Sequence, residues 1–89
     1  MPQPLANSAS PHTHSLDQVP AGSSGVIVDL SGARSLVSRL ATLGFVPGGR
    51  VRMVQNYGRG PVIVLVRQSR CALGRGEAAQ IVVEEAEAA

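Results

Sequence analysis

The chain has no lysine and no tryptophan, and it has only one phenylalanine, one tyrosine and one cysteine among its 89 residues. Without lysine, a phosphate-binding loop of the GxxxxGK[ST] type cannot occur. A single cysteine cannot form an intramolecular disulfide, which agrees with a reducing compartment. No apolar run approaches the ~18 residues of a membrane span, and no apolar signal segment is found at the N-terminus. The sequence therefore predicts a cytoplasmic protein that binds no nucleotide.

Charge of either sign is also scarce. The formal net charge is +2, and all eight basic residues are arginines that are spread along the chain. A field that attracts nucleic acid needs clustered charge, so this distribution favours ordinary solvated surface. Nucleic-acid binding by a small barrel also uses aromatic platforms, and only Tyr57 and Phe45 are available, with Phe45 expected in the core. Both features argue against a nucleic-acid partner.

Local composition divides the chain into three parts. Residues 1–14 are rich in proline, serine and alanine, and they are predicted to form a disordered N-terminal tail. Residues 15–84 form one domain, and residues 85–89 form a short acidic tail. A domain of this size buries only about 60% of its unfolded surface, so a large active-site cavity would be hard to build.

One amphipathic helix is predicted near residues 33–43. Leu36, Leu40 and Leu43 follow the i, i+4, i+7 spacing of one helix face. Ser31 or Gly32 is the expected N-cap. Because an isolated helix of three turns is marginal in water, the leucine face is expected to pack on the rest of the domain.

The stretch LGFVPGGRV after this helix predicts a helix-to-strand corner. Gly44 is expected in the left-handed conformation that ends a helix, with Phe45 folding back on Leu40 in a Schellman motif. Pro47 and Gly48 suit the central positions of a type II turn, because proline fixes φ and glycine accepts a positive φ. These glycines do not form a nucleotide-binding motif, because they lack its spacing and the strand-loop-helix context that it requires.

Short β-branched runs supply the remaining elements. Gly58–Gly60 separates two of these runs as a hairpin loop, and Glu77–Ala79 suits a single helical turn. Closing the sheet would hide its edges, so we predict a mainly β fold: a small SH3-like barrel of about five short antiparallel strands with one inserted helix. An open α+β sheet with the helix on one face is the alternative. The predicted strands are 25–30, 51–57, 61–67, 70–73 and 80–84.

A set of short motifs follows in order along residues 15–84: Leu16 with Gly22, Val26–Leu30, Arg39-Leu40, Leu43-Gly44-Phe45-Val46-Pro47-Gly48, Pro61–Val66, Ala72-Leu73-Gly74, Glu77-Ala78 and Ile81–Val83. In this order and spacing the motifs resemble the ferrous iron transport protein A (FeoA) family. Two departures stand out: the first 14 residues have no place in the family pattern, and Arg70-Cys71 stands where an apolar or small residue is expected.

The resemblance implies an SH3-like barrel and a small cytosolic accessory protein of ferrous iron uptake. Its implied partner is the FeoB-type membrane transporter, which carries a cytosolic GTP-hydrolysing domain. It implies no catalysis, no cofactor and no small-molecule substrate in this chain. The same barrel occurs as the C-terminal domain of iron-dependent repressors of the diphtheria toxin repressor type. A freestanding barrel in transcriptional regulation or nucleic-acid binding is therefore the alternative, although the chain has no room for a helix-turn-helix module.

A partner-binding face is predicted on the outer side of the helix and the hairpin tip. Tyrosine and arginine are favoured anchors in protein interfaces. Under the alternative interpretation, the valine packs inward and the arginines are only solvated. The predicted residues are Arg34, Val37, Arg39, Tyr57 and Arg59.

Candidate metal ligands are few. His12 and His14 are two residues apart, and Cys71 is alone, whereas a stable site needs three or four ligands held in geometry. We therefore expect no metal site, and weak binding by the histidine pair is the alternative. No spacing pairs the acidic residues with a nucleophile or a base, so no catalytic set is predicted.

Overall fold

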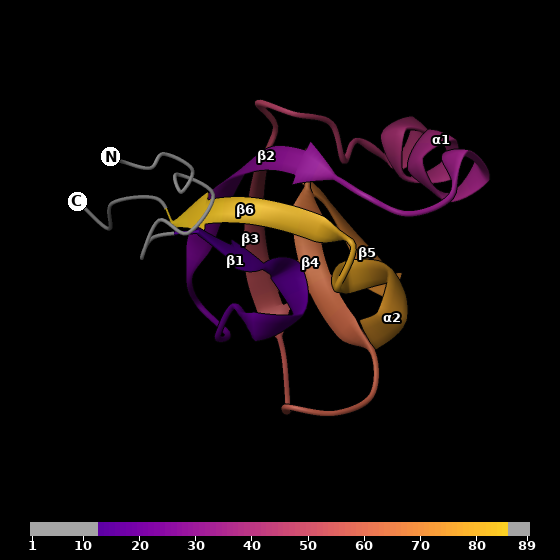
Figure 1. The fold of residues 1–89 in the computed structure, drawn as a ribbon. Coiled ribbons are helices and arrows are strands. Elements are labelled where there is room, and N and C mark those ends of the chain that lie inside the picture. Colours follow the sequence, from indigo (N-terminus) through magenta and orange to yellow (C-terminus); the bar gives the residue numbers. More distant parts are fainter. Residues whose placement is uncertain (1–12, 86–89) are drawn as a thin grey trace, which may run out of the picture.

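The computed structural model describes residues 13–85, which form six strands, one principal helix and two short helical turns (Figure 1). The elements follow the predicted order closely. They are β1 (Thr13–Ser15), the 3-10 turn η1 (Leu16–Gln18), β2 (Ser24–Leu30), α1 (Arg34–Leu43), β3 (Arg50–Gln55), β4 (Val62–Val66), β5 (Ser69–Leu73), α2 (Arg75–Ala78) and β6 (Ile81–Glu85).

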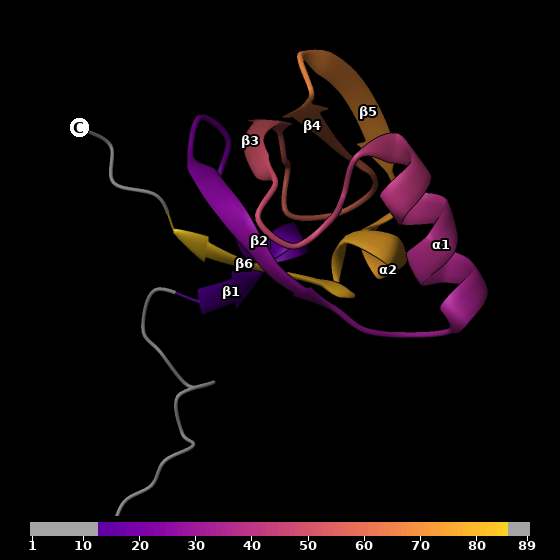
Figure 2. The same ribbon diagram turned by 90° about the horizontal axis from the view of Figure 1, so that it is seen from above.

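All six strands belong to one antiparallel sheet with the order β1-β6-β2-β3-β4-β5. The sheet curls around the core, and α1 stands beside one end of it (Figures 1 and 2). Register shifts between Ile27 and Asp29 and between Met53 and Gln55 help the curl, because a bulge bends its strand. The predicted small β-barrel with one inserted helix is confirmed over the open α+β alternative.

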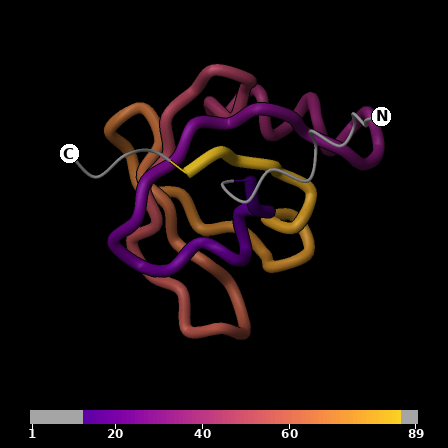
Figure 3. The backbone as a smooth tube through the Cα atoms, turned by 60° about the vertical axis from the view of Figure 1, so that its left-hand side comes forward, coloured from indigo at the N-terminus to yellow at the C-terminus, as the bar shows by residue number. Residues whose placement is uncertain are grey.

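The strand count differs from the prediction by one. Thr13–Ser15 forms β1, which pairs with β6 through Thr13↔Glu84 and Ser15↔Val82 (Figure 3). This strand begins inside the segment predicted to be a disordered tail. Its residues are polar and carry no local strand signal, so the strand depends on a partner at the other end of the chain. Residues 1–12 and 86–89, including His12, lie outside the described part of the chain.

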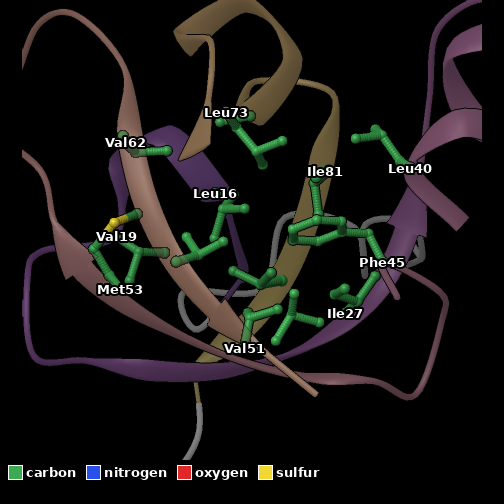
Figure 4. Packing of buried hydrophobic residues seen from close by; sticks show 14 residues of the cluster. Leu16, Val19, Ile27, Leu40, Phe45, Val51, Met53, Val62, Leu73 and Ile81 are labelled. Carbon is green, nitrogen blue, oxygen red and sulfur yellow. The ribbon is translucent and has the colours of Figure 1, made fainter. Parts of the chain in front are cut away.

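The core is a single cluster that every long element enters. Strand residues alternate between the cluster and the surface, as in the buried–half-buried alternation of β4. Phe45, Leu16 and Leu40 are fully buried, and the Phe45 ring points into the middle of the cluster (Figure 4). The buried members are Leu16, Val19, Ile27, Leu40, Phe45, Val51, Met53, Val62, Val64, Val66, Leu73, Ala78, Ile81 and Val83.

The corner between α1 and β3 has the predicted geometry. Gly44 has φ 110°, its N–H bonds Ala41 O at 3.0 Å, and the Phe45 N–H bonds Leu40 O at 2.9 Å, which together make a Schellman motif. Gly48 has φ 89°, and the Gly49 N–H bonds Val46 O at 2.9 Å across a type II turn. This corner directs Phe45 into the core.

The predicted N-cap of α1 is wrong. Ala33 precedes the helix with extended φ and ψ, and no side chain caps the first turn. The Ser31 hydroxyl instead donates to Gln80 Oε1 at 2.7 Å, and its backbone N–H donates to Gln80 O at 2.8 Å. Ser31 therefore ties the end of β2 to the turn before β6, a tertiary role that local sequence does not reveal.

A polar network fixes the base of the β3–β4 hairpin. Arg75 donates to Gly60 O at 3.1 Å, to Asp17 O at 3.0 Å and to Asn56 Oδ1 at 2.6 Å. Asn56 Nδ2 donates to Asp17 O and to Val19 O at 2.8 Å. One arginine and one asparagine thereby satisfy three carbonyls, two at η1 and one in the hairpin loop, which holds α2, η1 and the hairpin together.

Candidate partner-binding surface

Helix α1 is anchored more lightly than its leucine spacing predicts. Leu40 is its one fully buried residue, Leu36 and Val37 are half-buried, and Leu43 is 43% exposed. The helix ends at Gly44, and Phe45 rather than Leu43 takes the next position in the core. Helix α1 therefore presents the exposed Arg34 at its start and the exposed Leu43 at its end.

Arg39 links the two helices. Its guanidinium forms an ion pair with the Glu77 carboxylate on α2, while its side chain remains 60% exposed. Glu77 Oε1 also accepts the Gly74 N–H at 3.0 Å, which satisfies a free donor at the start of α2. The predicted interface residue Arg39 thus already has a partner within the domain.

The predicted hairpin residues lie far from the helix. Tyr57 is 76% exposed and Arg59 is exposed, both in the loop between β3 and β4. That loop is at the bottom of Figures 1 and 3, whereas α1 is at the top. The five residues predicted as one face therefore form two patches, one with Arg34, Val37 and Arg39 and the other with Tyr57 and Arg59.

A third surface was not predicted from the sequence. Arg50 and Arg52 are exposed and alternate with the buried Val51 and Met53 along β3. Strand pairing places Arg52 opposite Leu65, and Leu65 opposite Arg70. We call this surface the arginine face: it consists of Arg50, Arg52, Arg67 and Arg70 around the half-buried Ile63 and Leu65.

The turn between β4 and β5 adds Arg67 to this face. Arg67 and Gln68 have φ 52° and 65° between the paired residues Val66 and Ser69, as a two-residue type I′ hairpin requires. A Cβ added to Gly44 would lie 3.0 Å from Arg67 Cδ, so the arginine stem lies over the glycine. Two open depressions adjoin here, and Arg50 and Arg67 line both of them.

The register, not the sequence order, creates the arginine face, which explains why arginines spread along the chain were assigned to ordinary surface. The alternate spacing of Arg50 and Arg52 in a strand was the available signal. The unexpected Arg70-Cys71 pair also fits the structure: Arg70 is exposed, whereas Cys71 packs against the core from the other side of β5. No local disruption accompanies this departure from the family pattern.

The metal-ligand candidates in the described residues lie apart. His14 is on β1, with Nε2 3.8 Å from Glu85 Oε1, and the free Cys71 is on β5, at the opposite end of the strand order. Within residues 13–85, no three His, Cys, Asp or Glu side chains are grouped closely enough to hold a metal ion. The same part of the chain contains no helix of the length and apolarity that crossing a membrane requires.

A curled antiparallel sheet with short connections defines this chain as an SH3-like barrel. Residues 14–85 match the FeoA domain family, and the chain belongs to that family. A relative in Methanocaldococcus jannaschii, described as an Fe(2+) transport protein A, is 32% identical over 66 residues, covering 74% of this chain and 79% of that protein.

Solved structures agree with this assignment. FeoA from Stenotrophomonas maltophilia, an SH3-domain protein solved in complex with zinc, is 35% identical with a TM-score of 0.69, over 78% of this chain and 87% of that chain. An iron uptake regulatory protein, also FeoA, is 26% identical with a TM-score of 0.79, over 83% and 99%. A manganese-dependent transcriptional repressor shares the fold at 20% identity and a TM-score of 0.78, but this chain spans only 44% of it.

Proposed function

We propose that this protein is a cytoplasmic, non-enzymatic accessory protein of ferrous iron uptake that binds and modulates the cytosolic part of a FeoB-type transporter. The observation that carries the proposal is the FeoA match, which extends over residues 14–85 and thus over the whole described barrel. The name of the 32% identical relative, an Fe(2+) transport protein A, supports the same process.

The geometry favours action by contact. The most fully bonded charged groups serve the fold, because Arg75 binds backbone carbonyls and Glu77 joins α1 to α2. The exposed groups instead lie on three surfaces that a partner could reach: the outer side of α1, the hairpin tip and the arginine face. Binding to one conformation of the transporter's cytosolic domain would shift its population, which is sufficient for modulation.

A second candidate is a freestanding regulatory barrel that binds nucleic acid. The fold shared with the manganese-dependent repressor favours it, although 20% identity supports a likeness of fold alone. Binding of this kind would weaken steeply with salt, since it depends on releasing counterions from phosphates.

The deciding experiment is interferometry with the full chain immobilised and the purified cytosolic part of the FeoB-type transporter from the same organism in solution. Saturable binding, together with no binding to duplex DNA or RNA at ~150 mM salt, is expected. Saturable, salt-dependent nucleic-acid binding with no transporter binding would instead establish the second candidate.

The α1 and hairpin patches can be tested in the same experiment. The double variant Arg39→Ala/Tyr57→Ala removes one exposed side chain from each patch. Binding that weakens severalfold would place the interface on one of these patches, because arginine and tyrosine are common anchors. Unchanged binding would discard both residues as contacts.

A further inference from the structure

The arginine face carries positive charge that the domain does not neutralise. The close pairs of ionisable side chains among residues 13–85 are His14–Glu85 and Arg39–Glu77, and neither involves this face. Glu84 lies on the same side of the sheet, opposite Val26, which is in turn opposite Arg50. Two strand spacings, about 9–10 Å, separate the backbones of Glu84 and Arg50, and no ion pair joins these two side chains. Four guanidinium groups are thus available to a partner.

The centre of this face is apolar. Ile63 and Leu65 alternate with the buried residues of β4, so they point outward, yet they are only half-buried. Arg52 and Arg70 stand on either side of Leu65 in register, where their aliphatic stems can lie along it. An apolar centre with a charged rim is the usual composition of a protein-binding surface.

Spacing and chemistry indicate which partner fits. Arg50 and Arg52 are two residues apart on one strand, so they repeat at about 6.6–6.8 Å, as alternate side chains of an extended peptide do. A guanidinium binds a carboxylate through two parallel hydrogen bonds, which lysine cannot do. An extended segment that carries acidic and apolar residues on one face, as in the pattern Glu-x-Leu-x-Glu, could therefore place its carboxylates on the arginines and its apolar side chain on Leu65.

Single-stranded nucleic acid fits this face less well. Its sequence-tolerant binding depends on aromatic side chains that stack with bases. Phe45 is fully buried, and Tyr57 is in the β3–β4 loop at the far end of the barrel (Figure 3). The described part of the arginine face offers charge and aliphatic surface but no aromatic ring.

We propose that the arginine face docks an extended acidic peptide segment whose apolar residue rests on Leu65 and whose carboxylates pair with Arg50, Arg52 and Arg70. This inference rests on the proposed function, because it assigns the peptide segment to the cytosolic part of the transporter.

The test compares two double variants of the full chain. Arg52→Gln/Arg70→Gln removes two charges from the arginine face, and the matched control Arg34→Gln/Arg59→Gln removes two exposed charges from the other two patches. Each lowers the formal net charge from +2 to 0. All four positions are exposed, so melting temperatures should stay close to that of the unmodified protein.

Three probes are titrated by fluorescence anisotropy or interferometry: the transporter's cytosolic part, a labelled peptide with the repeat Glu-Gly-Leu-Gly, whose glutamates and leucines share one face when extended, and a single-stranded oligonucleotide of equal charge. We expect the Arg52/Arg70 variant to weaken peptide and transporter binding by at least about fivefold, from two lost exposed charge contacts. The Arg34/Arg59 variant should change both by less than about twofold.

Other outcomes separate the two proposals. Equal losses in both variants would show a net-charge effect and overturn the assignment of this face. Transporter binding that Arg52→Gln/Arg70→Gln leaves unchanged would also overturn the assignment of this face, but it would leave the proposed function intact. Peptide binding that depends on these arginines, with no transporter binding, would uphold the face and reject the proposed function. An oligonucleotide that binds more tightly than the peptide would overturn the peptide as occupant.

Discussion

The β4–β5 turn should become more stable when Gln68 is replaced by glycine. Gln68 has φ 65°, and its side chain is exposed. A residue with a Cβ loses about 1–2 kcal/mol in the left-handed conformation, and glycine avoids this strain. Glycine also has more freedom in the unfolded chain, which offsets about 0.5–1 kcal/mol of that gain. The free energy of unfolding should therefore rise by about 0.5–1 kcal/mol.

Thermal unfolding followed by circular dichroism measures this change. In a domain of this size, 1 kcal/mol shifts the melting temperature by about 4–8 °C, so Gln68→Gly should raise it by about 2–8 °C. The matched control is Gln68→Ala, which removes the same polar atoms but keeps the Cβ and hence the strain. It should leave the melting temperature within about 2 °C of the parent. A glycine variant no more stable than the alanine variant would refute this account of the turn.

Three further substitutions test the contacts that assemble the barrel. Gly44→Val should lower the free energy of unfolding by more than about 1–2 kcal/mol, because it adds strain at φ 110° and brings a Cβ to 3.0 Å from Arg67 Cδ; an unchanged melting temperature would contradict this. Arg75→Gln should cost on the order of 1–3 kcal/mol in urea unfolding, because the hydrogen bonds of a charged guanidinium to Gly60 O, Asp17 O and Asn56 Oδ1 are lost, whereas Arg70→Gln should cost almost nothing. Glu77→Gln breaks the largely exposed pair with Arg39 and should cost less than about 1 kcal/mol, and high salt should shrink the difference; a larger, salt-independent loss would assign the stabilisation to something other than this pair.

Features governed by neighbouring residues could be predicted from the sequence. The helix, its Schellman closure at Gly44 and the Pro47-Gly48 turn depend on residues within one or two turns of each other, and all three were confirmed. The hairpin around Gly58–Gly60 was also found, with strands one or two residues shorter than predicted. Local conformational preference was sufficient at each of these positions.

Features governed by distant partners were missed. The polar Thr13–Ser15 becomes a strand only because β6 runs beside it, and Ser31 turns to Gln80 rather than capping α1. The arrangement of the candidate site was missed for the same reason, because the predicted residues of the helix and the hairpin lie in two separate patches. The arginine face needed the pairing of Arg52, Leu65 and Arg70, and strand register cannot be read from spacing along the chain alone.

The central claim is that this FeoA-family barrel acts by direct contact with the FeoB-type transporter. Its most direct test is the dissociation constant of the full chain for the transporter's purified cytosolic part, measured at ~150 mM salt. The account predicts saturable binding that the Arg52→Gln/Arg70→Gln variant weakens by at least about fivefold while Arg34→Gln/Arg59→Gln does not. Absence of saturable binding by the folded, unmodified chain would contradict the claim.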